Sequence, residues 1–191
     1  MILPGILSSQ ISGHLYSYST DFYQIATATV TSGGAATVTF SSIPSTYKHL
    51  QIRISAESNR ATYGTDSVQF KINNDVGTNY SFHQLGTDGS TAYGLGVINT
   101  ATMYWDVIGT TQSAFGGGVV DILDYANTNK YKTFRSLMGN DNNGTIAGSG
   151  GAVALASGNW RNTAAIDTIT LNPVYGTLFN QNSTFALYGV K

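Results

Sequence analysis

The amino-acid sequence predicts an all-β protein: a single antiparallel β-sandwich of jelly-roll type, with about eight to ten strands and an extended N-terminal arm. Two observations lead to this prediction. Apolar and polar residues alternate with a period of two in many short segments, as they do in strands with one buried face. Clusters of Gly, Asn and Ser separate those segments, and these residues are typical of tight turns.

The first half of the chain contains four predicted strands: residues 25–30, 37–40, 50–56 and 68–72. The first two are rich in Thr and flank Ser32-Gly33-Gly34, so we expect them to pair as a hairpin. Residues 80–85 fit either a strand or a helical turn, and residues 93–105 show no clear pattern.

The second half contains five further predicted strands: residues 118–125, 132–138, 152–156, 167–171 and 184–190. The first of these has the most continuous apolar run, which favours a central position in a sheet. Residues 127–130 form a predicted turn that leads back into the next strand. Residues 139–144 (Gly-Asn-Asp-Asn-Asn-Gly) are predicted to form another turn, because Gly and Asn tolerate positive φ.

Residues 1–20 differ from the rest of the chain because their apolar side chains follow no strand register. We interpret this segment as a docking arm and residues 21–191 as one sandwich domain, since all-β domains of this size often remain undivided. The arm lacks the basic start and the long apolar stretch of a secretory signal. The side chains expected to bind a partner are Ile2, Leu3, Ile6, Leu7, Ile11 and Leu15.

The chain carries few charges. Lys, Arg, Asp and Glu make up 10% of its residues, against roughly 25% in an average soluble domain. Nine basic and ten acidic residues leave a net charge of -1, so the basic stripe of a nucleic-acid-binding protein is missing. No apolar run is long enough to span a membrane, and the absence of cysteine fits synthesis in a reducing cytoplasm. Because little charge repulsion holds such surfaces apart, we expect this one to lie against a partner.

No residue pattern nominates a catalytic residue, a metal site or a cofactor. Asp121 and Asp124 lie three residues apart on a predicted strand and point to opposite faces, so they do not form the carboxylate pair of a glycosidase. Residues 140–144 resemble part of a calcium loop but lack its closing Glu, which favours a hairpin turn. None of the three histidines has a second ligand at metal-binding spacing: His14, His49 and His83.

Aromatic side chains are the remaining candidates for a binding role, since exposed Tyr and Trp stack on sugar rings and anchor protein interfaces. For the two tryptophans, burial in the sandwich core or in an interface is favoured over contact with a glycan. The candidates for glycan or interface contacts are Tyr16, Tyr18, Tyr104, Trp105 and Trp160.

Five stretches of the chain resemble a family of small virion structural proteins of tailed bacteriophages, many of them from aquatic bacteria. The two most specific are Phe40-Ser-Ser-Ile-Pro-Ser-Thr-Tyr-Lys-His-Leu-Gln-Ile-Arg53 and Val120-Asp-Ile-Leu-Asp-Tyr-Ala-Asn-Thr-Asn-Lys-Tyr-Lys132. Members of the family are described as head-decorating, tail-fibre-like or simply structural. The resemblance implies a virion component and brings no catalytic residues with it. The other three stretches are residues 1–14, residues 77–80, and residues 160–166 with 185–189.

Together, the residues and the resemblance predict a non-enzymatic virion protein that is made in the cytoplasm of a host bacterium. The leading hypothesis is a capsid decoration (cement) protein, favoured as a homotrimer, whose arm and sandwich bind the major capsid protein or another virion protein on the outer surface of the head. The alternative is a receptor-binding module of a tail fibre or head fibre that contacts host surface glycans. A polysaccharide depolymerase and a generic lectin-like sandwich are the remaining readings. None of the favoured readings involves nucleic acid or a membrane.

Overall fold

The computed structural model describes residues 21–110, 114–143 and 151–191. Every regular element in these ranges is a strand, which confirms the predicted all-β class. The predicted arm, residues 1–20, lies outside the described residues. The strands are β1 (Phe22–Thr29), β2 (Val38–Phe40), β3 (His49–Ser58), β4 (Asp66–Ile72), β5 (Tyr80–Thr87), β6 (Ala92–Thr100), β7 (Met103–Thr110), β8 (Gly116–Leu123), β9 (Lys132–Asp141), β10 (Gly151–Trp160), β11 (Ile169–Pro173) and β12 (Thr184–Val190).

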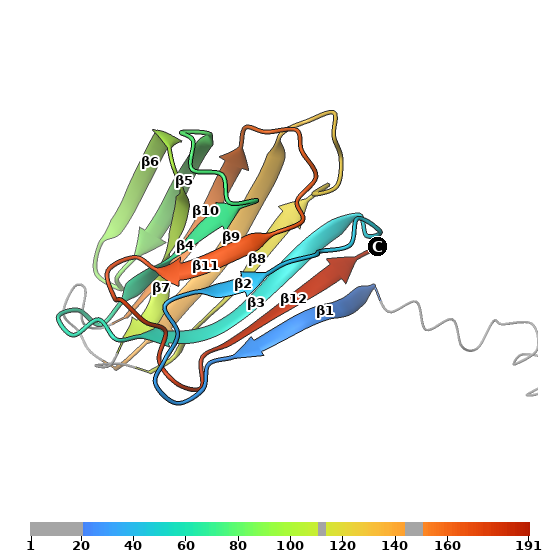
Figure 1. Cartoon of the computed structure of the whole chain (residues 1–191). Coiled ribbons are helices and arrows are strands. Elements are labelled where there is room, and N and C mark those ends of the chain that lie inside the picture. Colours follow the sequence, from blue (N-terminus) through green and yellow to red (C-terminus); the bar gives the residue numbers. More distant parts are fainter. Residues whose placement is uncertain (1–20, 111–113, 144–150) are drawn as a thin grey trace, which may run out of the picture.

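The strands form two layers, as expected of a sandwich-like fold (Figure 1). The large sheet is antiparallel and has the order β6-β5-β10-β9-β8-β3-β12-β1. The small sheet, β2-β11-β4-β7, lies across one face of the large sheet and is also antiparallel. The layers join where β3 runs parallel to β7 at Glu57 and Ser58. We call the face of the large sheet that points away from the small sheet the outer face.

The hydrophobic core fills the space between the two layers. Alternate residues of β3 (Leu50, Ile52 and Ile54) point inward from the large sheet, while Val68 and Phe70 of β4 point inward from the small sheet. This alternation is the reason why the period of two in the sequence locates most strands correctly. The largest fully buried side chains are Trp160, Tyr80, Tyr125, Phe70, Phe82, Lys132, Phe134, Phe179 and Phe185.

The strands predicted at residues 50–56, 68–72, 118–125, 132–138 and 184–190 are confirmed as β3, β4, β8, β9 and β12. The predicted central strand, β8, lies between β3 and β9 inside the large sheet. The ambiguous segments are strands as well: residues 80–85 fall in β5, and residues 93–105 are divided between β6 and β7. The described residues therefore hold twelve strands, more than the sequence predicted.

Two turn predictions were wrong. Residues 25–30 and 37–40 do not pair as a hairpin, because β1 pairs with β12 in the large sheet and β2 pairs with β11 in the small sheet. Gly33 and Gly34, at φ values of 95° and 77°, turn the chain from one layer to the other. The predicted turn at 139–144 begins later than expected, since β9 continues to Asp141 through its pairing with β10.

Candidate functional site

Trp160 was a candidate for contact with a glycan or a partner, and the structure places it in the core instead. Its side chain is 1% exposed, and its indole Nε1 donates a 2.7 Å hydrogen bond to Oδ2 of Asp75. Burial alone would raise the pKa of Asp75, but hydrogen bonds from Trp160, Asn79 and Gly77 outweigh it and lower that pKa. Trp160 is therefore a structural anchor, as the favoured alternative for the tryptophans had it.

The other aromatic candidates are distributed over β7 and the arm. Tyr104 of β7 is partly buried and packs edge-on against Phe82, with ring centroids 4.7 Å apart. The backbone of Trp105 pairs with Val68 of β4, but its side chain lies outside the described part of the structure. The two arm tyrosines and the six apolar arm residues also lie outside the described residues.

The outer face of the large sheet carries a row of apolar side chains that are at least partly exposed and that the sequence pattern did not indicate. Leu85 of β5, Leu155 of β10, Leu137 of β9 and Val119 of β8 are direct cross-strand neighbours and form what we call the apolar row. The three leucines are 62%, 56% and 58% exposed, respectively. Val153 extends the row along β10 and is 46% exposed. A contiguous apolar surface of this kind usually marks an interaction site.

The inward-pointing side chains beneath this row are small or polar. Gln84 of β5, Ala156 of β10 and Ser136 of β9 point inward, each one residue along the chain from an exposed leucine. A register shift of one residue would bury the leucines and expose the polar residues. The larger buried side chains on the same strands, such as Phe134 and Trp160, hold the observed register. The leucines are therefore outside because of the packing of their own strands.

A polar row follows the apolar row, two residues further along the strands. Gln51 donates a 2.9 Å hydrogen bond from Nε2 to Oδ1 of Asp121, and Arg135 donates one of 2.9 Å from Nε to Oδ2 of the same carboxylate. Arg53 donates from Nε to Oε1 of Gln51, also at 2.9 Å. Its guanidinium stacks on Tyr188, 4.6 Å from the ring centroid. The outer face is thus divided into an apolar part and an ordered polar part.

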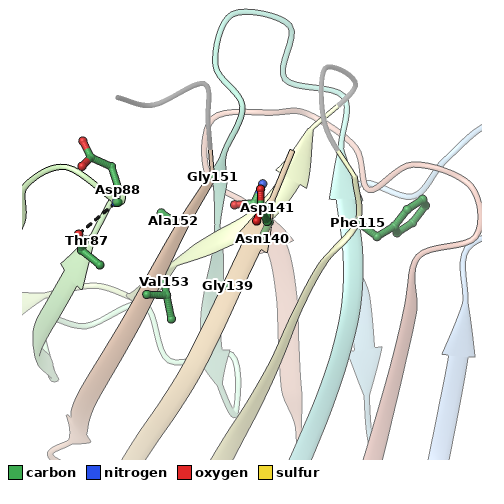
Figure 2. A pocket seen from close by; sticks show the side chains of 10 residues that line it. Thr87, Asp88, Phe115, Gly139, Asn140, Asp141, Gly151, Ala152 and Val153 are labelled. Carbon is green, nitrogen blue, oxygen red and sulfur yellow. Dashed lines mark hydrogen bonds between the residues drawn. The ribbon is translucent and has the colours of Figure 1, made fainter. Parts of the chain in front are cut away.

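A hollow of about 600 Å³ lies beside the apolar row at the end of β5, β9 and β10. Its wall combines a carboxylate of Asp88, the polar Asn140 and Asp141, and the aromatic Phe115. Figure 2 shows Asp88 and Phe115 on opposite sides of the hollow, so its side chains do not converge on one point. Asp88 is also engaged locally, since its Oδ1 accepts hydrogen bonds from the backbone N–H groups of Ser90 and Thr91. The hollow resembles a shallow surface depression more than a catalytic cleft.

A second exposed cluster lies near the loop that follows β11. The guanidinium of Arg60 stacks between the rings of Tyr63 and Tyr175, 4.3 Å from each centroid. Both tyrosines are more than half exposed. The buried carboxylate of Asp66 holds this loop in place by accepting hydrogen bonds from the backbone N–H groups of Tyr175 and Gly176. Tyr and Arg are the residues most often enriched at the centres of interfaces.

The two stretches that carry the most specific phage resemblance lie side by side. β3 from the first stretch pairs with β8 from the second. At the end of this pair, the hydroxyl group of Tyr125 donates to the backbone carbonyl of Pro44, and Nδ1 of His49 accepts a 2.9 Å hydrogen bond from the backbone N–H of Asp124. This hydrogen bond gives His49 a structural role in the corner where β3 and β8 meet. These contacts thus stabilise one corner of the sandwich.

The acidic residues considered for catalysis belong to separate networks. Asp121 lies in the polar row, whereas Asp124 follows β8 in a turn, where it binds the Lys130 amine. That hydrogen bond is the main reason why the pKa of Asp124 is lowered. Among the described residues, no cluster of three or more His, Cys, Asp or Glu is arranged to hold a metal ion. The described part of the chain also has no helix of the length and hydrophobicity needed to cross a membrane.

Comparisons with known proteins give no relative for this chain: no family model, no curated protein and no solved structure matches it.

Proposed function

We propose that this protein is a non-enzymatic structural subunit of a bacteriophage virion, and that it decorates the outer surface of the head as a cement protein. The observation that carries the proposal is the apolar row, in which three leucines more than half exposed lie side by side on a sheet face. Covering each of them with a neighbouring subunit would stabilise the complex by roughly 1 kcal/mol or more. The low charge of the chain and the sequence resemblance to phage structural proteins support the same function.

In this function the sandwich and the arm have different tasks. The arm, with its uncharged and apolar sequence, docks on the major capsid protein or another virion protein. The outer sheet face contacts further copies of the chain, so that the subunits form a homo-oligomer on the head; a trimer is the assembly favoured by the sequence. The protein is made in the host bacterial cytoplasm and then becomes part of the virion.

Mass spectrometry of purified particles tests the location. A cement protein is present in a copy number similar to that of the major capsid protein, whereas a fibre tip is present in few copies. A high copy number that remains with heads after tails are removed supports the proposal. Absence of the protein from purified particles contradicts it.

Deletion of residues 1–15 tests the role of the arm. We expect the truncated protein to keep the circular-dichroism spectrum of a folded β protein but to lose cosedimentation with undecorated heads. The double variant Ile6→Ser/Leu7→Ser is a milder version with the chain length unchanged. Cosedimentation of both variants at the wild-type level would rule out docking through the arm.

The second candidate is a receptor-binding module of a tail fibre or head fibre that contacts host surface glycans. The observation that favours it is the Arg60 stack, because exposed tyrosines beside a polar depression suit stacking on sugar rings. Binding of the free protein to host lipopolysaccharide, abolished by Tyr63→Ala and Tyr175→Ala, would establish this function. No binding to host cells or to their glycans would exclude it.

A further inference from the structure

We propose that the apolar row is a contact between two copies of this chain, which pack their outer sheet faces together about a twofold axis. The axis runs along the strands between β9 and β10. The inference rests on the proposed function and deepens it, because it specifies how the copies that cover the row are arranged. A twofold pair replaces the trimer favoured by the sequence as the basic unit.

The first argument is that the row is complementary to itself in this arrangement. Rotation about the axis places β9 of one copy opposite β10 of the second copy, and β8 opposite β5. Leu137 then faces Leu155 of the second copy, and Val119 faces Leu85. Symmetry repeats each contact, so every apolar side chain of the row meets an apolar side chain. Such self-complementarity is what a twofold interface requires.

The second argument is the fit of the residues on one side of the row. Toward the hollow, the next outward positions are Val153 on β10, Gly139 on β9, Gly117 on β8 and Thr87 on β5. The same rotation places Val153 opposite Gly139 of the second copy, and Thr87 opposite Gly117. A larger side chain thus lies over a glycine in both cases, which allows the two faces to approach closely.

The third argument is that no like charges meet on the other side of the row. The outward positions there are His83 on β5, Ser157 on β10, Arg135 on β9 and Asp121 on β8. Rotation places Asp121 opposite His83 of the second copy and Arg135 opposite Ser157. No charged side chain in these positions faces a charge of the same sign. Pairing therefore brings no electrostatic repulsion between the two copies here.

The size of the surface fits a pair of moderate affinity. Strands spaced about 4.8 Å apart make the width of β6, β5, β10, β9, β8 and β3 roughly 29 Å. When two sheets pack face to face, their strand directions differ by about 30°. If the twofold axis bisects this angle, the apolar rows of the two copies still lie opposite each other near β9 and β10. The three outward rows are spaced about 6.8 Å apart and so cover roughly 20 Å along the strands. The buried area is then on the order of 600 Å² per copy, somewhat below the ~800 Å² of a standard stable interface. We therefore expect a pair that dissociates on dilution.

Sedimentation equilibrium of the full chain over a wide concentration range tests the pair directly. We expect a reversible shift from the 20.2 kDa chain to twice that mass as the concentration rises. The variants Leu137→Asp and Leu155→Asp should remain monomeric at all concentrations, because each places a carboxylate in the centre of the contact. Both positions are largely exposed in the single chain, so the variants should still fold, and circular dichroism checks this. The matched control is Val76→Asp, at an exposed apolar side chain in a turn away from the row, which should pair like wild type.

A charge-swap experiment separates self-pairing from any other use of the row. One chain carries Leu137→Lys and Leu155→Lys, and the other carries Leu137→Asp and Leu155→Asp. Each should be monomeric alone, while an equimolar mixture should form a one-to-one pair, because Lys and Asp then face each other across the axis. The matched control places the same charges at Val76 and Tyr131, which are exposed outside the outer face. Because the apolar row is intact in these chains, each should pair with itself as wild type does, and the mixture should show no preference for the one-to-one pair.

Failure of the twofold pair and failure of the proposed function are distinguished by different measurements. A wild-type mass of one chain at every concentration, or of three chains, would overturn the twofold pair, as would an equimolar mixture that stays monomeric. Particle copy number is measured separately and decides the virion function. A protein that pairs in solution but is missing from particles would keep the inference and reject the function, and the reverse result would do the opposite.

Discussion

Trp160 at the end of β10 donates its indole N–H to Asp75 in the turn between β4 and β5, across 2.7 Å. The same carboxylate accepts hydrogen bonds from the Asn79 side chain and from the backbone N–H of Gly77. One carboxylate thus joins the turn to the core of the large sheet. Its charge therefore contributes to the stability of this turn.

This network predicts a specific loss of stability in acid. The pKa of Asp75 is lowered in the folded protein, so its contribution is present above the ordinary value of 3.8 and is lost as the pH falls through the folded pKa. We expect Asp75→Asn to be less stable than wild type at pH 7 and to lose less stability between pH 5 and the acid limit. Urea unfolding as a function of pH measures this. Asp21→Asn, at an exposed carboxylate before β1, is the control, and an unchanged pH profile in Asp75→Asn would contradict the prediction.

We expect Lys132 to contribute more to the stability of the fold than the neighbouring Lys130. Its side chain is fully buried, and Nζ donates hydrogen bonds to the carbonyl oxygens of Asn127, Lys130 and Thr163. Burial, with a smaller effect of the Lys130 charge, lowers the pKa of this amine. Lys132→Met leaves the carbonyls without their donor and should reduce the free energy of unfolding by about 1–3 kcal/mol.

The matched control is Lys130→Met, because the Lys130 side chain is 53% exposed and its ion pair with Asp124 lies at the surface. We expect a change within about 0.5 kcal/mol for this variant. Chemical denaturation of both variants gives the comparison. Equal effects of the two substitutions would show that the carbonyl cluster does not need the buried amine.

At Gly189 on β12 we expect even alanine to destabilise the fold. The ring of Tyr47 covers this glycine, and an added Cβ would lie 2.2 Å from Cγ of that ring. Because Cγ is close to the backbone, the Tyr47 ring cannot move aside unless the loop before β3 moves with it. We therefore expect Gly189→Ala to reduce the free energy of unfolding by about 1–3 kcal/mol. Gly94→Ala on β6 is the control, because its nearest neighbour is 3.9 Å away. Thermal unfolding distinguishes the two, and a stable Gly189→Ala protein would disprove the close contact.

We expect the buried carboxylate of Asp66 to stabilise the loop that carries Tyr175 of the Arg60 stack. The side chain is 1% exposed, and its oxygens accept hydrogen bonds from Ser58 Oγ and from the backbone N–H groups of Ser67, Tyr175 and Gly176. Asp66→Asn replaces an acceptor by a donor that faces other donors, and should reduce the free energy of unfolding by about 3 kcal/mol. Asp141→Asn, at an exposed carboxylate on β9, should have a clearly smaller effect in the same denaturation assay. The idea fails if the two variants are equally stable.

The alternation of apolar and polar residues was sufficient to predict the fold class and most strands. Residues 50–56 and 68–72 show why: one set of alternate positions is strongly apolar and the other is polar, so the period of two also identifies the buried face. The hairpin predicted at residues 25–40 was wrong. Two Thr-rich strands that are close in sequence and joined by a Gly-Gly turn suggest pairing with each other. Their actual partners, β12 and β11, lie far along the chain.

The candidate site was not predictable by the same rule. In β10 the buried positions hold Ala154 and Ala156, while the larger Val153 and Leu155 are outside. A pattern rule assigns the larger apolar residues to the core, so it hides an exposed apolar surface. For Trp160 the sequence favoured the core or an interface over a glycan contact but did not choose between the first two, because a tryptophan that suits an interface also suits a core when a carboxylate satisfies its N–H.

The sequence by itself determined that this chain forms strands and that it carries little charge. Only the tertiary structure decided which face of β5, β9 and β10 is covered. On β5, β9 and β10 both faces carry apolar residues, so the period of two is satisfied by either choice. The choice is made by packing: the bulky rings of Phe82, Phe134 and Trp160 fill the space between the layers, and Leu85, Leu137 and Leu155 are left on the outer face.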